Sequence, residues 1–419
     1  MSYRPEPDRT PSVEEYAKLL SGTIRTRKHR GYAHWRNRAE CTLKLPRDHV
    51  ERDSMRISLC MIVRDEAACL DRCLSSVSDV VDEICIVDTG STDGTQEIAR
   101  EHGAVLAEVA WKDDFAAARN ASLELATGDW ILVLDADEEL LTSAAREHLL
   151  AVAEQHEHAA GHVWLFDEGD AERQIQPSRT QLARFFPRDE RIRFHGAIHE
   201  QVMFAGGQLP RVETSLEVRH DGYHHDELHH KHKLERNASM IMTALERTPE
   251  DPYLWWQLGR TLFVAELPNE ALDAFANALD RLAGDDEILV HVVEAAAYCL
   301  RSLGRSDDAL ELVGEISAAH ESRSDTCFLR ALLSMDVGAF DQAEQGFKHC
   351  LELGHLTPAK GLSVPASSGY AAAYNLGVMK EVLEETEDAR TYYQRALALN
   401  PEHALSRDGL ARVCHELPS

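Results

Sequence analysis

Short apolar runs alternate with amphipathic segments between Ile57 and about residue 225. The apolar runs favour strands and read "ISLCMIV", "EICIVD", "VLAEV", "WILVLD" and "HVWLF", and helical patterns such as "DEAACLDRCLSSV" and "DFAAARNASLELA" lie between them. A succession of strand, helix and strand predicts an α/β domain with a mainly parallel sheet covered on both faces. In such sheets ligands bind at the carboxyl ends of the strands, where Asp88, Asp135 and Asp137 fall.

One of these runs, "GDWILVLDADEELL" at residues 128–141, ends in a cluster of carboxylates. Because such a cluster beside a buried strand would repel itself and lose hydration, we expect a cation there. Hard oxygen ligands suit Mg²⁺ or Mn²⁺. We therefore expect Asp137 to bind the ion and the other carboxylate of the Asp-x-Asp (D-x-D) pair to face sugar or ribose hydroxyls. Acidic residues also begin helices, and we assign that role to Glu138 and Glu139.

Four blocks follow one another in this region: "ISLCMIVRDEAACLDRCLSSV", "DEICIVDTGSTDGTQEIA", "DDFAAARNASLELATGDW" and "WILVLDADE". Together they resemble the inverting family 2 glycosyltransferases with a GT-A fold, which is Rossmann-like, over roughly residues 57–225. The resemblance implies a UDP-sugar donor, with a metal ion that bridges the diphosphate and neutralises the leaving group. It implies nucleotide-sugar contacts from Val63, Arg64, Glu66, Asp88, Ser91, Arg119, Asn120, Asp135, Ala136 and Asp137.

The resemblance also implies individual roles in the donor site. Residues 64–66 lie in the first nucleotide-binding turn, and Asp88 would accept a hydrogen bond from the uracil ring. The "GSTDGT" loop opens a helix, where Ser91, Thr92 or Asp93 can cap free backbone amides.

The "AARN" block lies along the donor in these transferases. Arg119 would contact the diphosphate or the base, and Asn120 follows it directly. The alternative for Arg119 is an ordinary arginine on the surface of a helix.

The stretch "RFHGAIHEQVMF" places two histidines and a carboxylate close together. His195 and His199 could be metal ligands on a helix, but Gly196 and the flanking β-forming residues argue against a regular helix. By the resemblance, Glu200 is the general base that deprotonates the acceptor, and His199 is the second candidate. Either residue could instead have a structural hydrogen-bonding role.

A histidine-rich stretch, "VRHDGYHHDELHHKH", follows the predicted sheet. We expect most of its histidines on the exposed face of a helix that begins near Asp226, because the composition is a poor match for a zinc site. His220 differs, since it ends the apolar run "SLEVRH" and resembles a histidine that joins the D-x-D motif as a metal ligand in similar transferases.

Charge and cysteine content narrow the classes of partner and compartment. A formal net charge of −28 makes a general binder of nucleic acid or acidic membranes an unlikely class. No run is long and apolar enough for a membrane span, and "MSYRPEPDRT" lacks a signal-peptide core. Nine cysteines without a regular framework predict reduced thiols and a cytoplasmic protein. Cys69 and Cys73 lie one helical turn apart, and we interpret them as packing residues rather than a metal pair.

A repeat occupies the chain from about residue 237 to residue 419. One copy contains Trp255, Leu258, Gly259, Ala271, Phe275 and Ala278, and another contains Leu376, Gly377, Ala389, Tyr393, Ala396 and Pro401. The spacings match the 34-residue tetratricopeptide pattern, with weaker copies around Ala309 and around Ala343 and Phe347. We expect paired helices in which small residues allow close approach and aromatic residues fill the seam, interrupted by a loop at residues 354–369.

We therefore predict three regions: a basic arm at residues 1–55, a GT-A domain at residues 56–235 and a helical repeat domain at residues 236–419. This combination resembles the sublancin S-glycosyltransferase type, which attaches a sugar to a cysteine of a ribosomal peptide. A solenoid commonly binds extended peptide or a second subunit, so a peptide acceptor and a homodimer are both open. Two other classes stay open, namely a transferase for envelope saccharides or lipid-linked acceptors and a scaffold with an inactive transferase domain.

Overall fold

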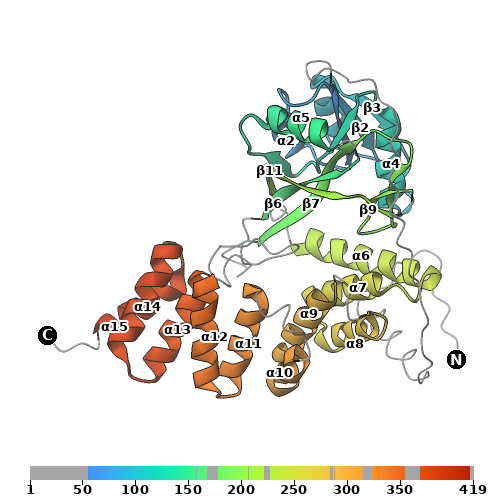
Figure 1. The fold of residues 1–419 in the computed structure, drawn as a ribbon. Coiled ribbons are helices and arrows are strands. Elements are labelled where there is room, and N and C mark those ends of the chain that lie inside the picture. Colours follow the sequence, from blue (N-terminus) through green and yellow to red (C-terminus); the bar gives the residue numbers. More distant parts are fainter. Residues whose placement is uncertain are drawn as a thin grey trace, which may run out of the picture. The chain divides into compact units, whose positions relative to one another are not determined.

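The computed structural model describes residues 55–156, 158–167, 178–205, 207–220, 227–283, 286, 288–314, 323–353 and 369–415. The chain divides into two compact units. The first comprises the described parts of Met1–Val163 and Ala183–Leu216, and the second comprises those of Trp164–Leu182 and Glu217–Ser419. Figure 1 shows the strands gathered in one part of the chain and a long run of helices in the other.

An eight-stranded sheet has the order β3-β2-β1-β4-β7-β6-β11-β5. Strand β1 pairs in parallel with β2 and β4, and β2 pairs in parallel with β3, whereas β7 runs antiparallel to β4. The predicted mainly parallel α/β sheet is therefore confirmed. The strands are β1 (Ile57–Val63), β2 (Glu83–Asp88), β3 (Val105–Glu108), β4 (Trp130–Val133), β5 (Glu138–Leu140), β6 (Ala160–Asp167), β7 (Ser178–Pro187) and β11 (Arg211–His220).

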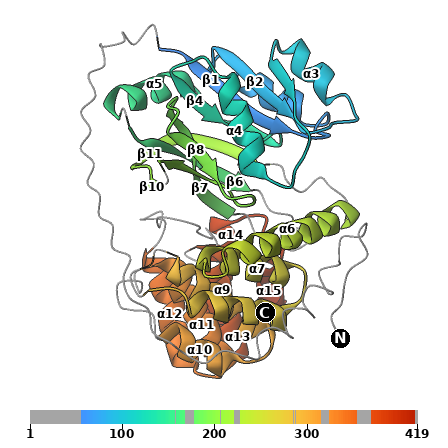
Figure 2. The ribbon, with the colours of Figure 1, turned by 90° about the vertical axis from the view of Figure 1, so that its right-hand side faces the viewer.

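Helices cover this sheet, as Figure 2 shows for α4 in front of the strands. They are α2 (Leu70–Ser76), α3 (Thr95–Glu101), α4 (Phe115–Leu125) and α5 (Ala145–Gln155). Asp114 begins α4 by accepting a hydrogen bond from the backbone N–H of Ala117 at 2.8 Å. The apolar face of α4 packs through Ala116 and Leu123 on Ile131 and other buried residues of the sheet.

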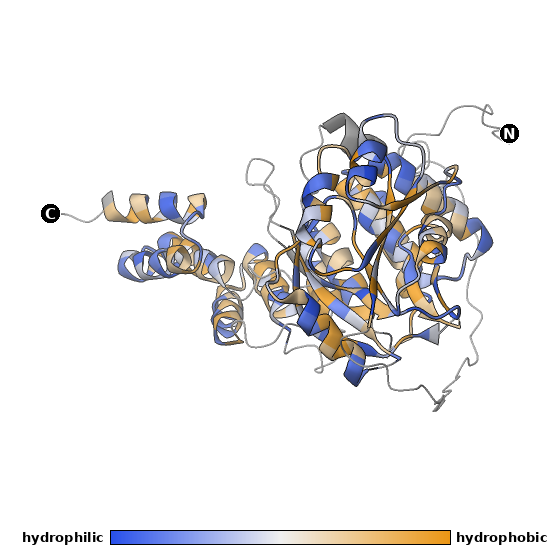
Figure 3. Ribbon diagram, turned by 90° about the horizontal axis from the view of Figure 1, so that it is seen from above, coloured by the Kyte–Doolittle hydropathy of each residue, from blue (hydrophilic) through white to orange (hydrophobic). Residues whose placement is uncertain are grey.

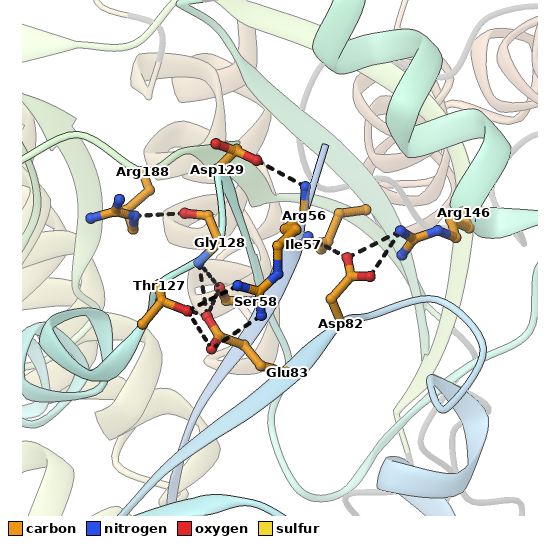
Figure 4. Close-up of polar contacts among 10 residues, drawn as sticks. All are labelled: Arg56, Ile57, Ser58, Asp82, Glu83, Thr127, Gly128, Asp129, Arg146 and Arg188. Atoms are coloured by element: carbon orange, nitrogen blue, oxygen red, sulfur yellow. Dashed lines mark hydrogen bonds and ion pairs between the residues drawn. The ribbon is translucent and has the colours of Figure 1, made fainter. Parts of the chain in front are cut away.

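The amino ends of β1 and β2 are tied to the loop before β4 by Glu83 (Figure 4). Its Oε1 accepts from the backbone N–H of Gly128 at 2.8 Å, and its Oε2 accepts from Thr127 Oγ1 at 2.7 Å. A side chain at Gly128 would place Cβ 2.5 Å from Ser58 Oγ, so this close approach requires glycine. Burial opposes ionisation of Glu83, but its hydrogen bonds outweigh burial and lower its pKa.

A second, three-stranded sheet has the order β10-β9-β8 and is antiparallel. Its strands are β8 (Ile192–His195), β9 (Gln201–Phe204) and β10 (Gly207–Gln208). In the stretch from His195 to Glu200, His195 ends β8 and the rest connects it to β9, so the expectation that this stretch is not a regular helix is confirmed.

The second unit contains a succession of helices. Hydrophobic and hydrophilic residues alternate in bands along many of them (Figure 3), as expected for helices that bury one face. The described helices are α6 (Glu227–Arg247), α7 (Pro252–Val264), α8 (Pro268–Leu279), α9 (Leu289–Ser302), α10 (Ser306–Gly314), α11 (Ser324–Asp336), α12 (Phe340–Leu353), α13 (Tyr370–Val382), α14 (Thr386–Leu399) and α15 (Ala404–His415).

Within two of the helix pairs, a glycine faces an aromatic ring. A Cβ on Gly259 of α7 would lie 2.4 Å from the ring of Phe275 of α8, and a Cβ on Gly377 of α13 would lie 2.7 Å from the ring of Tyr393 of α14. Both aromatic side chains are fully buried. The predicted roles of the small and aromatic repeat positions are therefore confirmed, because the missing side chain leaves room for the ring.

Several sequence features lie wholly or mostly outside the described residues. These are the basic arm at residues 1–54, the side chains of residues 221–232 in the histidine-rich stretch, and residues 354–368 of the predicted loop. Helix α6 runs through residues 235 and 236, where we predict the domain boundary, and that boundary stays a prediction. None of the described helices is both long and apolar enough to cross a membrane.

Candidate active site

The strands β1 and β2 end side by side at the carboxyl edge of the sheet. Val63 is the last residue of β1 and lies opposite Asp88, the last residue of β2, and both are buried. Arg64, which follows Val63, is exposed. The structure thus brings three of the predicted donor residues to one edge.

The loops that follow these two strands are hydrogen-bonded to each other. The backbone N–H of Asp65 donates to Ser91 Oγ at 2.9 Å, and that of Glu66 donates to Thr95 Oγ1 at 2.7 Å. Asp65 Oδ1 in turn accepts from the backbone N–H of Thr92 at 2.7 Å. The predicted donor residues Glu66 and Ser91 therefore lie in one pair of loops with mutually fixed positions.

Asp88 organises the second loop. Its Oδ1 accepts from the backbone N–H groups of Gly90 and Ser91, each at 2.8 Å, and its Oδ2 accepts from Gln96 Nε2 at 2.5 Å. Burial opposes ionisation of Asp88, but these hydrogen bonds outweigh it and lower its pKa. Asp88 is thus held as a carboxylate whose oxygens already accept bonds from the protein.

The start of α3 is capped by Asp93, one of the three residues expected there. Its Oδ1 accepts from the backbone N–H of Thr95 at 2.9 Å, and its Oδ2 accepts from that of Ala67 at 3.0 Å. The N-cap position itself is Gly94, which has no side chain to serve as a cap.

Asp135 follows β4 and binds two guanidinium groups. Its Oδ1 accepts from Arg119 Nη2 at 2.7 Å, and its Oδ2 accepts from Arg184 Nη2 at 2.9 Å. The pKa of Asp135 is low because these two positive charges outweigh the effect of burial. The cation expected at this carboxylate is therefore supplied, for Asp135, by the protein itself. Ala136 is buried and Asp137 is partly buried beside it.

The expectation that Glu138 and Glu139 begin a helix is wrong. Both lie in the strand β5, and Glu138 is 1% exposed. Its Oε1 accepts a hydrogen bond from Arg184, and its Oε2 accepts from the backbone N–H of Asp135 at 2.9 Å. Burial raises the pKa of Glu138 to about 7, and Arg184 opposes that rise. Glu139 instead lies 3.5 Å from the guanidinium of Arg72.

Arg119 of α4 is 8% exposed, so the alternative of an ordinary surface arginine is wrong. Besides its bond to Asp135, its Nε donates to Oε1 of Glu200, and its guanidinium lies 5.6 Å from the ring centre of Phe194. Burial disfavours its charge, but the two carboxylates outweigh burial and raise its pKa. Its Nη1 has no hydrogen-bond partner among the described residues.

The two candidate bases lie between β8 and β9. Glu200 has a side chain that is 12% exposed and is ion-paired with Arg119. His199 has a φ of 52°, in the left-handed region, and is partly buried, whereas His195 is exposed. The loop is held to the start of α4, because the backbone N–H of Phe115 donates to the backbone oxygen of Ala197 at 2.8 Å. Arg119 thus bonds both Glu200 and Asp135 and connects the two carboxylates.

The side chain of Asn120 is hydrogen-bonded to the backbone of β8. Its Nδ2 donates to the backbone oxygen of Phe194 at 2.9 Å, and its Oδ1 accepts from the backbone N–H of Phe194 at 2.9 Å. These bonds connect α4 to β8. The predicted donor contact of Asn120 stays a prediction, since both of its polar atoms have partners in this structure.

The predicted metal ligands of the site are Asp137 and His220. Among the described residues, no group of three or more His, Cys, Asp or Glu side chains is arranged to hold a metal. Mg²⁺ is usually bound through one or two carboxylates and the phosphates of a substrate, rather than by a cage of protein ligands. Asp137 at the sheet edge fits that mode. His220 ends β11 and is partly buried, and its role as a ligand stays a prediction.

Sequence reasoning missed Arg184 of β7 and the buried position of Glu138. The available signal was in "QLARFFPRD", where an arginine stands among apolar residues of a strand. A charge in such a position requires a buried partner of opposite sign. The four acidic residues after β4 were the candidate partners for Arg184.

Part of the chain matches a known protein family. Residues 58–209 match the model of the family described as glycosyl transferase family 2. A relative from Bacillus subtilis, the SPbeta prophage-derived glycosyltransferase SunS, is 29% identical over 245 residues, which are 54% of this chain and 54% of that protein.

Two other comparisons are with proteins that are described as TPR proteins. The TPR repeat-containing protein Synpcc7942_0270 of Synechococcus elongatus is 44% identical over 214 residues, which are 49% of this chain and 52% of that protein. The crystal structure of YrrB, a TPR protein with an unusual peptide-binding site, is 23% identical, with a TM-score of 0.33 over 43% of this chain and 85% of that chain. This chain spans about half the length of these two curated relatives. Residues 58–209 thus match the glycosyl transferase family 2 model and contain most strands of the mainly parallel, GT-A-like sheet, and the paired helices of the second unit have the spacing of tetratricopeptide repeats.

Proposed function

We propose that this protein transfers a sugar from a UDP-sugar, with inversion, to a cysteine thiol of a ribosomal peptide. The observation that carries the proposal is the connection of Asp135 to Glu200 through Arg119. It supports the proposal because the carboxylate proposed as the base is connected to the strand end that we propose holds the nucleotide-sugar. The family match over residues 58–209 supports a nucleotide-sugar donor.

The donor would lie along the carboxyl edge of β1, β2 and β4. The loops after β1 and β2 would hold the nucleotide, with Asp88 beneath it, and Asp137 would bind the metal ion that accompanies the diphosphate. That ion, Mg²⁺ or Mn²⁺, would supply positive charge to the leaving UDP. Arg119 is already surrounded by carboxylates, so its proposed donor contact would use the nitrogen Nη1, which lacks a partner among the described residues.

The transfer requires one proton acceptor. The acceptor thiol gives its proton to Glu200, its sulfur forms a bond to the anomeric carbon, and the bond from that carbon to the UDP oxygen breaks with its electron pair leaving on UDP. Because the sulfur attacks from the face opposite to UDP, the configuration inverts. Arg119 binds Oε1 of Glu200, which leaves Oε2 as the atom that we assign to take the proton.

The acceptor is proposed from the repeats and from the resemblance to S-glycosyltransferases. An elongated helical surface can contact an extended peptide at several points, which a small sugar acceptor does not require. A transferase for envelope saccharides or lipid-linked acceptors would use the same donor residues. Self-association into a homodimer is the alternative use of the repeats, and a scaffold with an inactive transferase domain is the alternative without catalysis.

The test is incubation of the full chain with a UDP-sugar, a divalent ion and a cysteine-bearing precursor peptide, followed by intact-mass measurement. We expect one added hexose-sized mass, which is lost when the cysteine is changed to alanine. If peptides stay unmodified with all common UDP-sugars while a saccharide or lipid acceptor is elongated, the peptide proposal is wrong. If no acceptor is modified and no UDP-sugar is hydrolysed, the scaffold alternative replaces it.

A further inference from the structure

Arg184 connects two carboxylates of the candidate site and is itself buried. It comes from β7, the antiparallel neighbour of β4, and its side chain is 8% exposed. One nitrogen, Nη2, donates both to Oδ2 of Asp135 and to Oε1 of Glu138. The same guanidinium therefore fixes Asp135, two residues after the end of β4, and Glu138, the first residue of β5.

The contacts continue from Asp135 to the candidate base. Glu138, Arg184, Asp135, Arg119 and Glu200 form a chain in which carboxylates and guanidinium groups alternate. The side chains of both arginines and of both glutamates are 12% exposed or less, whereas that of Asp135 is 34% exposed. Asp135 is thus the member of this chain with the most access to a ligand.

We propose that Arg184 is a positioning residue for the transfer reaction: it fixes the carboxylate of Asp135 and, through Arg119, the carboxylate of Glu200. This inference rests on the proposed function, since it assigns Arg184 to that same site. Without Arg184, Asp135 would keep one of its two guanidinium partners and could turn toward Arg119. The carboxylates of Asp135 and Glu200 would then no longer be held in fixed positions relative to each other.

A buried arginine can also act only through stability, and the chain offers a pair of variants that separates the two roles. Arg184→Met leaves the buried Glu138 carboxylate without its partner, which destabilises the fold. Arg184→Met combined with Glu138→Gln removes that stranded charge, while the glutamine oxygen can still accept the bond from the backbone N–H of Asp135. The double variant should regain stability but not the position of Asp135.

A conservative variant and a control complete the set. Arg184→Lys keeps a positive nitrogen, and because a single nitrogen of Arg184 makes both contacts, a lysine can replace part of them. Arg188→Met is the matched control. Arg188 follows β7 directly, but it donates to the backbone oxygen of Gly128 at 2.6 Å, at the amino end of β4 (Figure 4).

The experiment compares the full-length wild type with the four variants. It measures the melting temperature of each protein, and its kcat and KM for hydrolysis or transfer of a UDP-sugar in the presence of a divalent ion. We expect kcat to fall at least about 100-fold in Arg184→Met and in the double variant, about tenfold in Arg184→Lys and less than about threefold in Arg188→Met. We expect the double variant to melt within a few degrees of the wild type.

The outcomes separate the two proposals. If the wild type neither hydrolyses nor transfers any UDP-sugar, the proposed function fails, and the role of Arg184 fails with it. If the wild type is active and the double variant regains both stability and the wild-type kcat, the proposed function stands and the positioning role of Arg184 is wrong. The same conclusion follows if Arg188→Met lowers kcat as much as Arg184→Met does.

Discussion

Asn120 and Phe194 exchange two hydrogen bonds, each 2.9 Å long, between the side chain of one and the backbone of the other. The side-chain amide of Asn120 therefore makes the two hydrogen bonds with Phe194 of β8 that the backbone of a neighbouring strand would make. The loop that carries Glu200 begins directly after this strand. The position of the candidate base therefore depends on a side chain of α4 that need not touch a substrate.

Replacing Asn120 by Asp tests this connection. Aspartate cannot donate to the backbone oxygen of Phe194, so we expect the free energy of unfolding to fall by about 1–3 kcal/mol. Urea unfolding of both proteins measures the difference. Asn277→Asp, at a half-buried position of α8 whose side-chain amide donates to the backbone oxygen of Asp273 in an exposed hydrogen bond, is the control and should change stability by less than about 0.5 kcal/mol. Equal effects of the two changes would contradict the assigned role of Asn120.

Asp137→Ala should abolish sugar transfer and donor hydrolysis while the protein stays folded, because this carboxylate would contribute charge to the metal ion. Excess chelator should do the same to the wild type. The control is Glu139→Gln, two residues further on and near Arg72, which should keep the activity. Full activity in chelator would remove the metal from the mechanism and the proposed roles of Asp137 and His220 with it.

Glu200→Gln should reduce transfer by an amount that depends on the acceptor. A serine hydroxyl needs a base to remove its proton, so we expect a loss on the order of 10²- to 10⁴-fold. A cysteine thiol, with a pKa of about 8.5, is partly ionised at neutral pH, so its loss should be smaller and should shrink as pH rises. Rates for matched serine and cysteine peptides across pH measure this. Equal losses at every pH would assign Glu200 to positioning.

Glu83→Gln should reveal a pH-dependent part of stability. The folded protein lowers the pKa of Glu83 below its ordinary value of 4.5, so the carboxylate stabilises the fold above the ordinary pKa. That contribution is lost as pH falls through the lowered pKa. We expect the variant to be less stable by about 1–3 kcal/mol at pH 7 and the difference to shrink in acid. Urea titrations at several pH values test this, with the exposed Glu124→Gln as the control; a constant difference would contradict it.

Gly259→Ala should destabilise the helical repeats, because the added Cβ would lie 2.4 Å from the ring of Phe275. We expect a loss of about 1–3 kcal/mol, measured by thermal unfolding. Gly314→Ala in α10 is the matched control, since its Cβ would meet no atom within 4 Å and alanine favours a helix. A loss at residue 314 as large as that at residue 259 would show that close packing is not the cause.

Much of the fold was predictable because its signals are local. The apolar run of β1 and the apolar run of β2 predict their strands at the observed residues, and the repeat spacing predicts that small residues and aromatic residues fill the seam between paired helices. The partners of Asp135 were not predictable from spacing. Arg184 lies 49 positions along the chain from Asp135, and Glu200 lies 81 positions from Arg119. Only the tertiary fold decides that Arg184 donates to both Asp135 and Glu138.

The alternating carboxylates and guanidinium groups also set an order for folding during synthesis. Strands β1, β2, β3 and β4 can pair once residue 133 has emerged from the ribosome, since the pairing among these four strands involves no later residue. Asp135 and Glu138 must then stay hydrated until Arg184 arrives with β7, because burying them without it would leave charges unpaired. The candidate base arrives later still, with residue 200. A chain released from the ribosome before that point would contain the strands of the candidate site without Glu200.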